Sequence, residues 1–332
     1  MFKVSVIVPI FNVSKYLPRF FNSLKHQKLA DVEYILVDDG STDNSLQMCY
    51  KFQHEMNNVK VFHHKNMGVG LTRNIGLQNA KGKYVYFCDP DDTLKNDLLS
   101  DNYSLAEKYQ ADLVIFGFKT QNITGQITSK TKLKFQFCNS KADFINIFPT
   151  LCHNFLINYL WNKFYRRKVI QNFRFEDVRT GEDIRFNFLV YNSISKVLIN
   201  DKIYYYYFQG RPNSSQFFKK IDDITLYLQE NKQLENLLFN LWNKKNNDKF
   251  ISIVKKAYMA TGRGLILRVE DRSNYIERNK ILQSFSKYKL NKYIKFDRKL
   301  GFNFNYNVLI FKLRYVPFIL SLDKLLRKLK EK

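Results

Sequence analysis

The sequence predicts an α/β protein with a mostly parallel sheet flanked by helices, and three observations lead to this fold class. Through residues 1–100, short β-branched runs alternate four times with amphipathic stretches, which is the pattern of a doubly wound sheet. Acidic residues follow two of these runs directly. With 332 residues and 45% hydrophobic residues, the chain can form a large core, whereas 12 glycines and 6 prolines exclude a collagen-like or linker-dominated chain.

Each expected element has its own local signal. Residues 4–10 form a continuous β-branched run, as expected of a strand buried on both faces, and residues 197–208 alternate enough for a strand. Ser14 is placed as the N-cap of the first helix, in which Leu17, Phe20, Phe21 and Leu24 recur at helical spacing. The strands are predicted at 4–10, 33–37, 59–63, 83–88, 112–118 and 197–208, further helices at 41–52 and 68–80, a hairpin or exposed loop at 120–140, and mostly helix at 220–290.

Charge and cysteine usage restrict the partners and the compartment. The net charge of +24 would attract nucleic acid, anionic lipid head groups or phosphorylated small molecules, and composition alone does not choose among them. The four cysteines lie far apart without a CxxC pair, which favours a reducing, cytoplasmic setting over a disulfide scaffold or zinc ribbon. Neither a secretion signal nor a membrane-spanning run of ~18 apolar residues is recognised.

The carboxyl-terminal segment 317–332 has a different pattern. Its leucines form one helical stripe, lysines and arginines occupy the remaining positions, and Pro317 can start the helix. Such a basic amphipathic helix can lie in an anionic membrane surface, and it can equally pack on the protein.

Two acidic turns are candidates for chemistry. Asp38-Asp39-Gly40-Ser41 follows a strand and could accept hydrogen bonds from a base or ribose, although Asp-Gly-Ser is also ordinary turn and N-cap chemistry. Asp89-Pro90-Asp91-Asp92 places three carboxylates in four residues, and their repulsion favours binding of Mg²⁺ or Mn²⁺. The alternative to a metal site is that these acids complement the dipole at a helix N-terminus. This alternative explains Asp92 better than Asp89.

A glycine-rich segment lies between these turns. In Asn66–Gly76 the glycines stand at a loop-to-helix junction, where the backbone can approach a phosphate, and Arg73 could bind a diphosphate. The dinucleotide-binding fingerprint would instead follow the first strand, where this chain has Pro9-Ile10-Phe11-Asn12.

Five segments in this order and spacing resemble the inverting family-2 glycosyltransferases with the GT-A fold, which is Rossmann-like. They are VSVIVPIFN (4–12), ILVDDGSTD (35–43), NMGVGLTRNIGL (66–77), GKYVYFCDPDD (82–92) and TGED (180–183). The resemblance covers about residues 1–210. It implies a GT-A domain over 1–215, with a nucleotide-binding half at about 1–100 and an acceptor half at about 101–215. A mainly helical region would follow at 216–332.

The resemblance also implies a role for each site residue. Asp39 would bind the uracil of a UDP-sugar, with Pro9 and Asn12 lining the base pocket and with Gly68 and Arg73 near the nucleotide. Asp89 and Asp91 correspond to the DxD element, in which Asp91 would ligate Mn²⁺ or Mg²⁺ and Asp89 would face the ribose or the metal. Asp183 would be the general base. Glu182 and Trp161 would lie on the acceptor side. The alternatives are that Trp161 is a residue of the core and that the Glu-Asp pair caps a helix.

Together these signals predict a metal-dependent, inverting glycosyltransferase. It would add one hexose or N-acetylhexosamine from a UDP-sugar to a bacterial surface glycan, such as capsule, lipopolysaccharide or exopolysaccharide. Since the QxxRW motif of processive relatives is absent from the sequence, single addition is expected. The acceptor could be lipid-linked, which suits a cytoplasmic protein held on the inner face of the membrane by residues 317–332. A sugar nucleotidyltransferase and a basic nucleic-acid-binding protein are the alternatives; the first lacks its glycine-rich turn, and the second lacks a basic recognition motif.

Overall fold

The first strands of the sheet are mostly apolar, and the first two along the sequence are buried over their whole length. This computed structural model describes residues 1–122, 124–153, 156–178 and 181–209, together with Gln229, 232–237, Asn240, Ile253 and Lys255. β1 (Val4–Ile10) and β2 (Val32–Asp38) are buried at every position, whereas β3 (Val59–His63) is half-buried at the edge. Continuous apolar runs therefore form interior parallel strands, as expected.

The strands join into one sheet, which has ten members among the described residues. Eight of them follow the order β3-β2-β1-β4-β9-β6-β10-β5, while β7 pairs with β6 and β8 pairs with β10. The pairs β1–β2, β1–β4 and β2–β3 are parallel, as is β6–β10. β9 runs antiparallel between β4 and β6. The remaining strands are β4 (Tyr84–Phe87), β5 (Thr93–Leu94), β6 (Leu113–Gln121), β7 (Ile127–Lys130), β8 (Gln136–Cys138), β9 (Lys163–Arg166) and β10 (Val197–Phe208).

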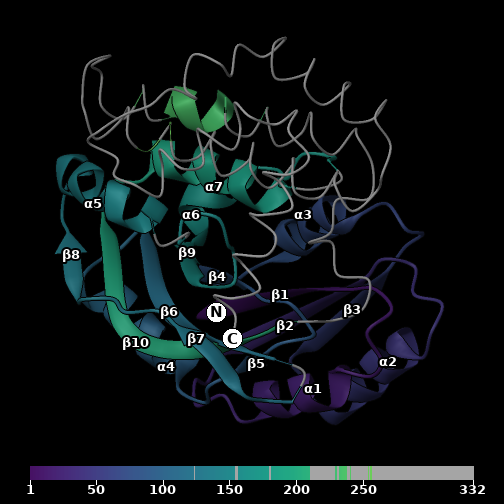
Figure 1. Ribbon diagram of the computed structural model, residues 1–332. Helices are drawn as coiled ribbons and strands as arrows, with labels where there is room; N and C mark the ends of the chain where they lie inside the picture. The colour runs from purple at the N-terminus through teal and green to yellow at the C-terminus, as the bar shows by residue number, and fades with distance from the viewer. Residues whose placement is uncertain are drawn as a thin grey trace, which may run out of the picture. The chain divides into compact units, whose positions relative to one another are not determined.

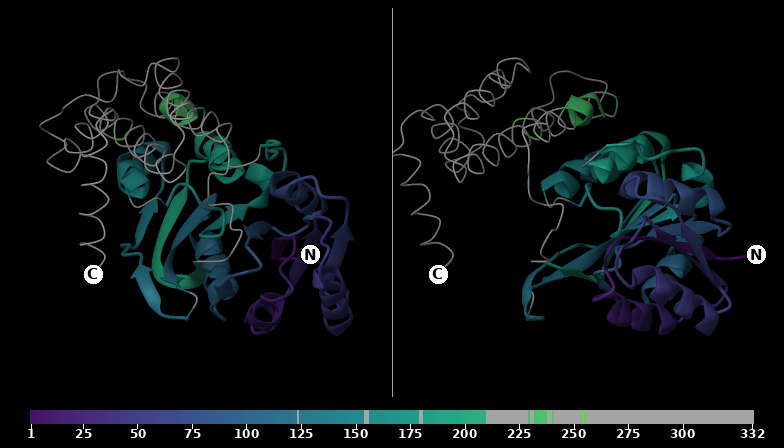
Figure 2. Two further views of the ribbon diagram at one scale, coloured as in Figure 1. Left: turned by 45° about the vertical axis from the view of Figure 1, so that its right-hand side comes forward. Right: turned by 90° about the vertical axis from the view of Figure 1, so that its right-hand side faces the viewer.

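Helices cover both faces of this sheet (Figure 1). In that view α1, α2 and α4 lie below the sheet and α3, α6 and α7 above it, and the rotated views of Figure 2 agree. The helices are α1 (Leu17–Lys25), α2 (Ser45–Glu55), α3 (Val69–Asn79), α4 (Leu98–Lys108), α5 (Lys141–His153), α6 (Arg167–Ile170) and α7 (Glu182–Ser193). The predicted mostly parallel α/β sheet is confirmed.

Some local expectations were wrong. Ser14 is not the N-cap of α1, because the helix begins at Leu17 with proline in its first turn, and the backbone N–H of Ser14 donates to Asp43 at 3.0 Å. The second helix begins at Ser45 rather than near residue 41, since the intervening acidic turn is held by its own hydrogen bonds.

The segment 120–140 was expected to be a hairpin or an exposed loop. It contains β7, which pairs antiparallel with β6 and so forms a hairpin.

The chain divides into two compact units, Met1–Ser214 and Ser215–Lys332. Residues 232–237 of the second unit are helical. The domain limits and the helical carboxyl-terminal region stay predictions, and the segment 317–332 lies outside the described residues. Among the residues that the structure describes, no helix is both long and apolar enough to cross a membrane.

Candidate active site

The carboxyl ends of β1, β2 and β4 meet at one edge of the sheet and carry the predicted site residues. The parallel register pairs Ile10 with Asp38, so Asn12 and Asp39 both lie just beyond the ends of two adjacent strands. Ile7 of β1 pairs with Phe87 of β4, which brings the Asp89–Asp92 turn to the same edge. Ligands of open α/β sheets bind at this edge.

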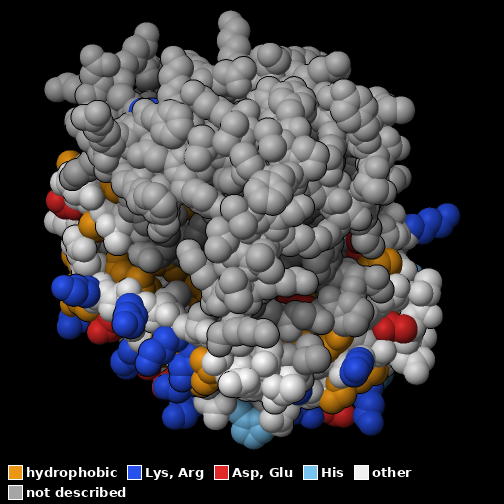
Figure 3. Space-filling view, in the orientation of Figure 1, with side chains coloured by type: hydrophobic (Ala, Val, Ile, Leu, Met, Phe, Trp, Pro, Cys, Tyr) orange, Lys and Arg blue, Asp and Glu red, His pale blue; other side chains and the backbone are white. Residues whose placement is uncertain are grey.

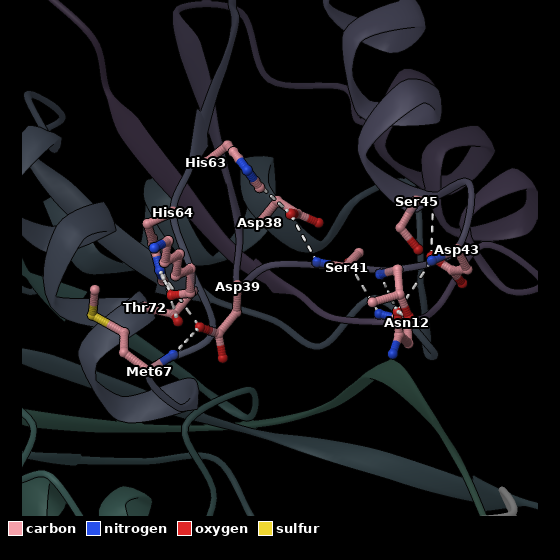
Figure 4. A network of polar contacts seen from close by, with 12 residues as sticks. Asn12, Asp38, Asp39, Ser41, Asp43, Ser45, His63, His64, Met67 and Thr72 are labelled. Atoms are coloured by element: carbon pink, nitrogen blue, oxygen red, sulfur yellow. Dashed lines mark hydrogen bonds and ion pairs between the residues drawn. The ribbon is translucent and has the colours of Figure 1, made fainter.

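Asp39 connects β2 to the glycine-rich entry of α3 (Figure 4). Its carboxylate accepts the backbone N–H of Met67 at 2.7 Å and that of Gly68 at 3.1 Å. Gly68 is the N-cap of α3 and has φ +96°, a conformation that favours glycine. The sequence pattern therefore placed the glycine correctly at a loop-to-helix junction, where it lies against the acid predicted to bind uracil.

Asn12 organises the opposite side of the same turn. Its side-chain oxygen accepts the backbone N–H of Thr42 at 2.8 Å and that of Asp43 at 3.3 Å (Figure 4). Asn12 itself has φ +50°, which asparagine tolerates better than most residues. Gly40 is required here, because a Cβ atom would lie 2.7 Å from the backbone nitrogen of Asn66. Pro9 is buried in β1, opposite Val37 of β2.

Arg73 brings the donor-side and acceptor-side acids together. This residue of α3 is 4% exposed, and its guanidinium donates to Glu182 at 2.8 Å, to Asp183 at 2.6 Å and to Asp89 at 3.1 Å. Burial alone would lower the pKa of Arg73, but the charges of Asp183, Asp89 and Glu182 outweigh it and raise that pKa, so the arginine stays charged. Asp89 and the adjacent pair Glu182 and Asp183, which lie far from it in the sequence, therefore share one cation.

The environment of Asp183 suits a proton acceptor. Burial raises its pKa well above the ordinary aspartate value, the nearby carboxylates Glu182 and Asp89 add to this rise, and Arg73 opposes it. Asp183 lies in the first turn of α7, whose N-cap is Gly181; Thr180 of the predicted TGED motif lies outside the described residues. A raised pKa brings a carboxylate closer to the range in which a general base is effective.

The three acids of the Asp89–Asp92 turn have different surroundings. Asp92 is 1% exposed and accepts the Tyr205 hydroxyl and the backbone N–H of Phe208, both at 2.6 Å. Burial, together with the charges of Asp91 and Asp89, raises the pKa of Asp92 well above its usual value. Asp92 thus fastens the turn to β10, while the side chain of Asp89 is 28% exposed beside Arg73 and that of Asp91 is half-buried.

These donors fit a cation that is shared with a substrate. Among the described residues, no three or more His, Cys, Asp or Glu side chains form a group that could hold a metal. Magnesium and manganese, however, are usually held by one or two carboxylates plus substrate phosphates. Asp89 and Asp91 are hard oxygen donors of that number, so they fit a metal–diphosphate complex better than a metal held by protein alone.

Trp161 lies in an aromatic cluster rather than on the surface. Its side chain is 3% exposed and stacks on Tyr159 and Tyr205, each with ring centroids 4.5 Å from those of Trp161. Its predicted contact with the acceptor stays a prediction. Tyr205, which holds Asp92, was missed by sequence reasoning, although the run of four tyrosines at 204–207 was the available signal.

The sheet order and the acids at one strand edge define an α/β protein of the kind that binds nucleotides or their derivatives. The sequence model of the family described as Glycosyl transferase family 2 matches residues 5–174, and the chain belongs to this family. The predicted family is thereby confirmed.

Individual relatives agree with this assignment. The chain is 33% identical over 217 residues to the cholesterol galactosyltransferase of Borreliella burgdorferi. This match covers 63% of the chain and 60% of the relative. It is 30% identical over 210 residues to the glycosyltransferase GlyA of Streptococcus pneumoniae serotype 4, covering 62% of this chain and 30% of GlyA. The chain thus spans three fifths or less of the length of these relatives.

A solved structure supports the fold. The crystal structure of Staphylococcus aureus TarS 1–349 in complex with UDP-GlcNAc has a TM-score of 0.59 and 22% identity to this chain, and the match covers 81% of this chain and 83% of TarS 1–349. This similarity confirms the predicted GT-A fold.

Proposed function

We propose that this protein is an inverting glycosyltransferase that transfers one hexose or N-acetylhexosamine from a UDP-sugar to a bacterial surface glycan. Family membership supports sugar transfer, and the UDP-GlcNAc in the TarS structure supports a UDP-sugar donor. The single observation that carries the proposal is the Arg73 cluster, because it joins Asp89 of the nucleotide half to Asp183 of the acceptor half.

The donor would bind along the edge formed by β1, β2 and α3. Asp39 would accept the uracil N–H, with Pro9 and Asn12 beside the base, and Gly68 and Arg73 would face the diphosphate. Since Asp39 already orients the backbone at Gly68, the base and diphosphate positions are linked through one carboxylate. Mn²⁺ or Mg²⁺ held by Asp89 and Asp91 would supply positive charge for the diphosphate.

The transfer would be an in-line displacement at the anomeric carbon. The acceptor hydroxyl oxygen forms the new bond to that carbon while the bond to the UDP oxygen breaks, and the hydroxyl proton passes to the Asp183 carboxylate. The leaving UDP takes the electron pair of the broken bond, and Arg73 stabilises its growing negative charge. Glu182, at 2.8 Å from the same guanidinium, would help to hold Arg73 and to line the acceptor side.

The acceptor and the membrane contact extend this proposal. A lipid-linked glycan would suit a protein attached peripherally to the inner face of the cell membrane through residues 317–332. Figure 3 shows lysine and arginine side chains along the lower left of the described surface, a distribution that would add to attraction by an anionic membrane. Loss of binding to anionic vesicles on deleting residues 317–332 supports the membrane contact, and unchanged binding contradicts it.

The decisive experiment measures UDP release from a panel of UDP-sugars with Mn²⁺. Asp183→Asn should abolish release while leaving UDP affinity unchanged, whereas Asp91→Ala should also weaken metal-dependent UDP binding. Asp101→Asn is the matched control, because its carboxylate pairs with Lys202 at 2.9 Å on another part of the sheet. Full turnover by either site variant removes that residue from its role, and salt-sensitive binding to random DNA without UDP release favours the nucleic-acid alternative.

A further inference from the structure

A cluster of aromatic rings lies beside the proposed site. Trp161 stacks on Tyr159 and Tyr205 at 4.5 Å between centroids and on Tyr207 at 5.2 Å, and its planes lie within 19° of theirs. Phe118 meets the indole edge-on at 4.7 Å. Stacked and edge-on arrangements are the ones that aromatic pairs prefer, and they stabilise the cluster.

The rings of this cluster differ in exposure. Trp161 is 3% exposed and Tyr205 is 0% exposed, so both rings are covered almost completely. Tyr159 and Tyr207 are half-buried, and their ring centroids are 6.4 Å apart with a tilt of 34° between the ring planes, so each ring offers its own flat face. The surface of the cluster is therefore made by these two tyrosines, with Trp161 packed against both of them.

Tyr207 is fixed next to the acidic turn. It follows Tyr205, whose hydroxyl donates to Asp92, by two residues on β10, and it precedes Phe208, whose backbone N–H also donates to Asp92. Burial raises the pKa of the Tyr207 hydroxyl, and the charges of Asp92 and Asp89 add to this effect. This ring thus lies within electrostatic range of the carboxylates at the end of β4.

Tyr159 is fixed to the helix that carries the proposed base. Asn187 lies one turn after Asp183 in α7 and donates through Nδ2 to the carbonyl oxygens of Asn158 at 3.0 Å and Tyr159 at 3.2 Å. From the sheet side, Lys163 donates to the carbonyl oxygens of Leu156 at 2.7 Å and of Tyr159.

Lys163, which holds the segment of Tyr159 from the sheet side, is a buried lysine. It is 0% exposed, and burial lowers the pKa of its amine, but the three acceptors of Nζ, which include Asn162 Oδ1 at 2.9 Å, match the three protons of the charged form and favour it. Burying a charge requires such complete hydrogen bonding. The backbone of residues 156–162 is therefore held from the sheet by Lys163 and from α7 by Asn187.

We propose that Tyr159 and Tyr207 form the surface on which the pyranose ring of the acceptor sugar stacks, and that Lys163 and Asn187 are positioning residues that hold Tyr159 beside Asp183. The proposal rests on the proposed function. The acceptor rather than the donor is the occupant, because the segment carrying Tyr159 is bonded to α7, the helix of the base that must reach the acceptor hydroxyl. The apolar face of a pyranose ring matches a flat aromatic surface, whereas an acyclic polyol offers no such face.

The test measures UDP release from the active UDP-sugar while the concentration of a methyl β-glycoside is varied. Glucoside, galactoside and N-acetylglucosaminide are the probes, and ribitol is the acyclic comparison. A glycoside that accepts the sugar raises release, and one that only occupies the surface excludes water and lowers it. Either response gives a half-saturating concentration, and a response to no glycoside at all overturns the proposal.

Variants locate the effect. Tyr207→Ala and Tyr159→Ala should each raise the half-saturating glycoside concentration roughly tenfold, and the phenylalanine variants should restore it. UDP affinity should not change. Tyr206→Ala is the matched control, since this half-buried neighbour on β10 points to the opposite face, where Lys119 Nζ lies 5.8 Å from its ring centroid.

The positioning role has a separate measurement. Asn187→Leu keeps a similar volume and removes both donors, so it should raise the half-saturating glycoside concentration while UDP affinity stays unchanged. A glycoside response that is equal in wild type, Tyr207→Ala and Asn187→Leu overturns this inference alone. Failure of the wild-type protein to release UDP from any UDP-sugar instead overturns the proposed function on which it rests.

Discussion

Replacing Arg73 by methionine tests the cation that holds the site together. The substitution keeps most of the side-chain volume and removes a guanidinium that contacts three carboxylates at 2.6–3.1 Å. Loss of one partner from a buried ion pair costs roughly 3–5 kcal/mol. The side chains of Asp89, Glu182 and Asp183 are 28%, 11% and 26% exposed, so water can partly solvate them, and the lower end of that range applies.

A loss of about 3 kcal/mol predicts that the melting temperature falls by roughly 6–12 °C, since each kcal/mol is worth about 2–4 °C in a domain of this size. Differential scanning calorimetry of wild type and variant measures this fall. Adding Asp183→Asn to Arg73→Met should restore part of the loss, because it removes one of the uncompensated carboxylates.

Lys202→Met supplies the control. The side chain of Lys202 is 62% exposed and pairs with Asp101 at 2.9 Å, and such an exposed ion pair contributes at most about 1 kcal/mol. This variant should be less destabilised than Arg73→Met. If the Arg73→Met variant melts within about 2 °C of wild type, or if the second substitution destabilises it further, the shared cation does not stabilise the fold as reasoned.

Three further outcomes are expected. Asp39→Asn replaces one of the two carboxylate oxygens, which accept backbone N–H groups, by an NH₂ donor that faces one of them. The variant should lose about 1–3 kcal/mol of unfolding free energy in denaturant and bind UDP more weakly in titration calorimetry. An unchanged unfolding free energy and UDP affinity would contradict the contact. Gly76→Ala places a Cβ atom 2.3 Å from Cγ2 of Ile7, so unfolding should become easier by about 1–3 kcal/mol, whereas a neutral result would mean that the helix shifts freely. Burial raises the pKa of Asp43, but the hydrogen bonds that its carboxylate accepts lower that pKa by more. The stabilising contribution of Asp43 is therefore present above the ordinary aspartate pKa and is lost as the pH falls through the lowered pKa. The loss of unfolding free energy caused by Asp43→Asn should shrink between pH 7 and about pH 3, and a loss that stays constant would refute this.

Sequence reasoning was most accurate where a signal was local. The limits of β1 and β3 match the predicted ranges 4–10 and 59–63, and the glycine at the N-cap of α3 follows from its junction between loop and helix. The strand ends also placed Asp39 and Asp89 at one edge, because the ends of parallel strands coincide.

Long-range pairing was not visible in the sequence. β9 has four residues and includes a buried lysine, so neither its length nor its pattern resembles a central strand, and only its pairing with β4 and β6 makes it one. The sequence suggested Asp92 only as a weaker metal candidate. Its actual partner, the hydroxyl of Tyr205, lies 113 positions later, so this contact could not be inferred from local sequence. The shared pairing of Arg73 with Glu182 and Asp183 is equally distant in sequence and therefore required coordinates.

The position of β9 has a consequence for the order in which the protein assembles during synthesis. The strands β3, β2, β1 and β4 can pair as soon as residues 1–87 have left the ribosome, since none of their contacts with one another needs a later segment. The partners β6 and β10, by contrast, join that sheet only through Lys163–Arg166. Until this short strand emerges, the open side of β4 stays an unprotected edge, and a nascent chain arrested before it is expected to bind holding chaperones there.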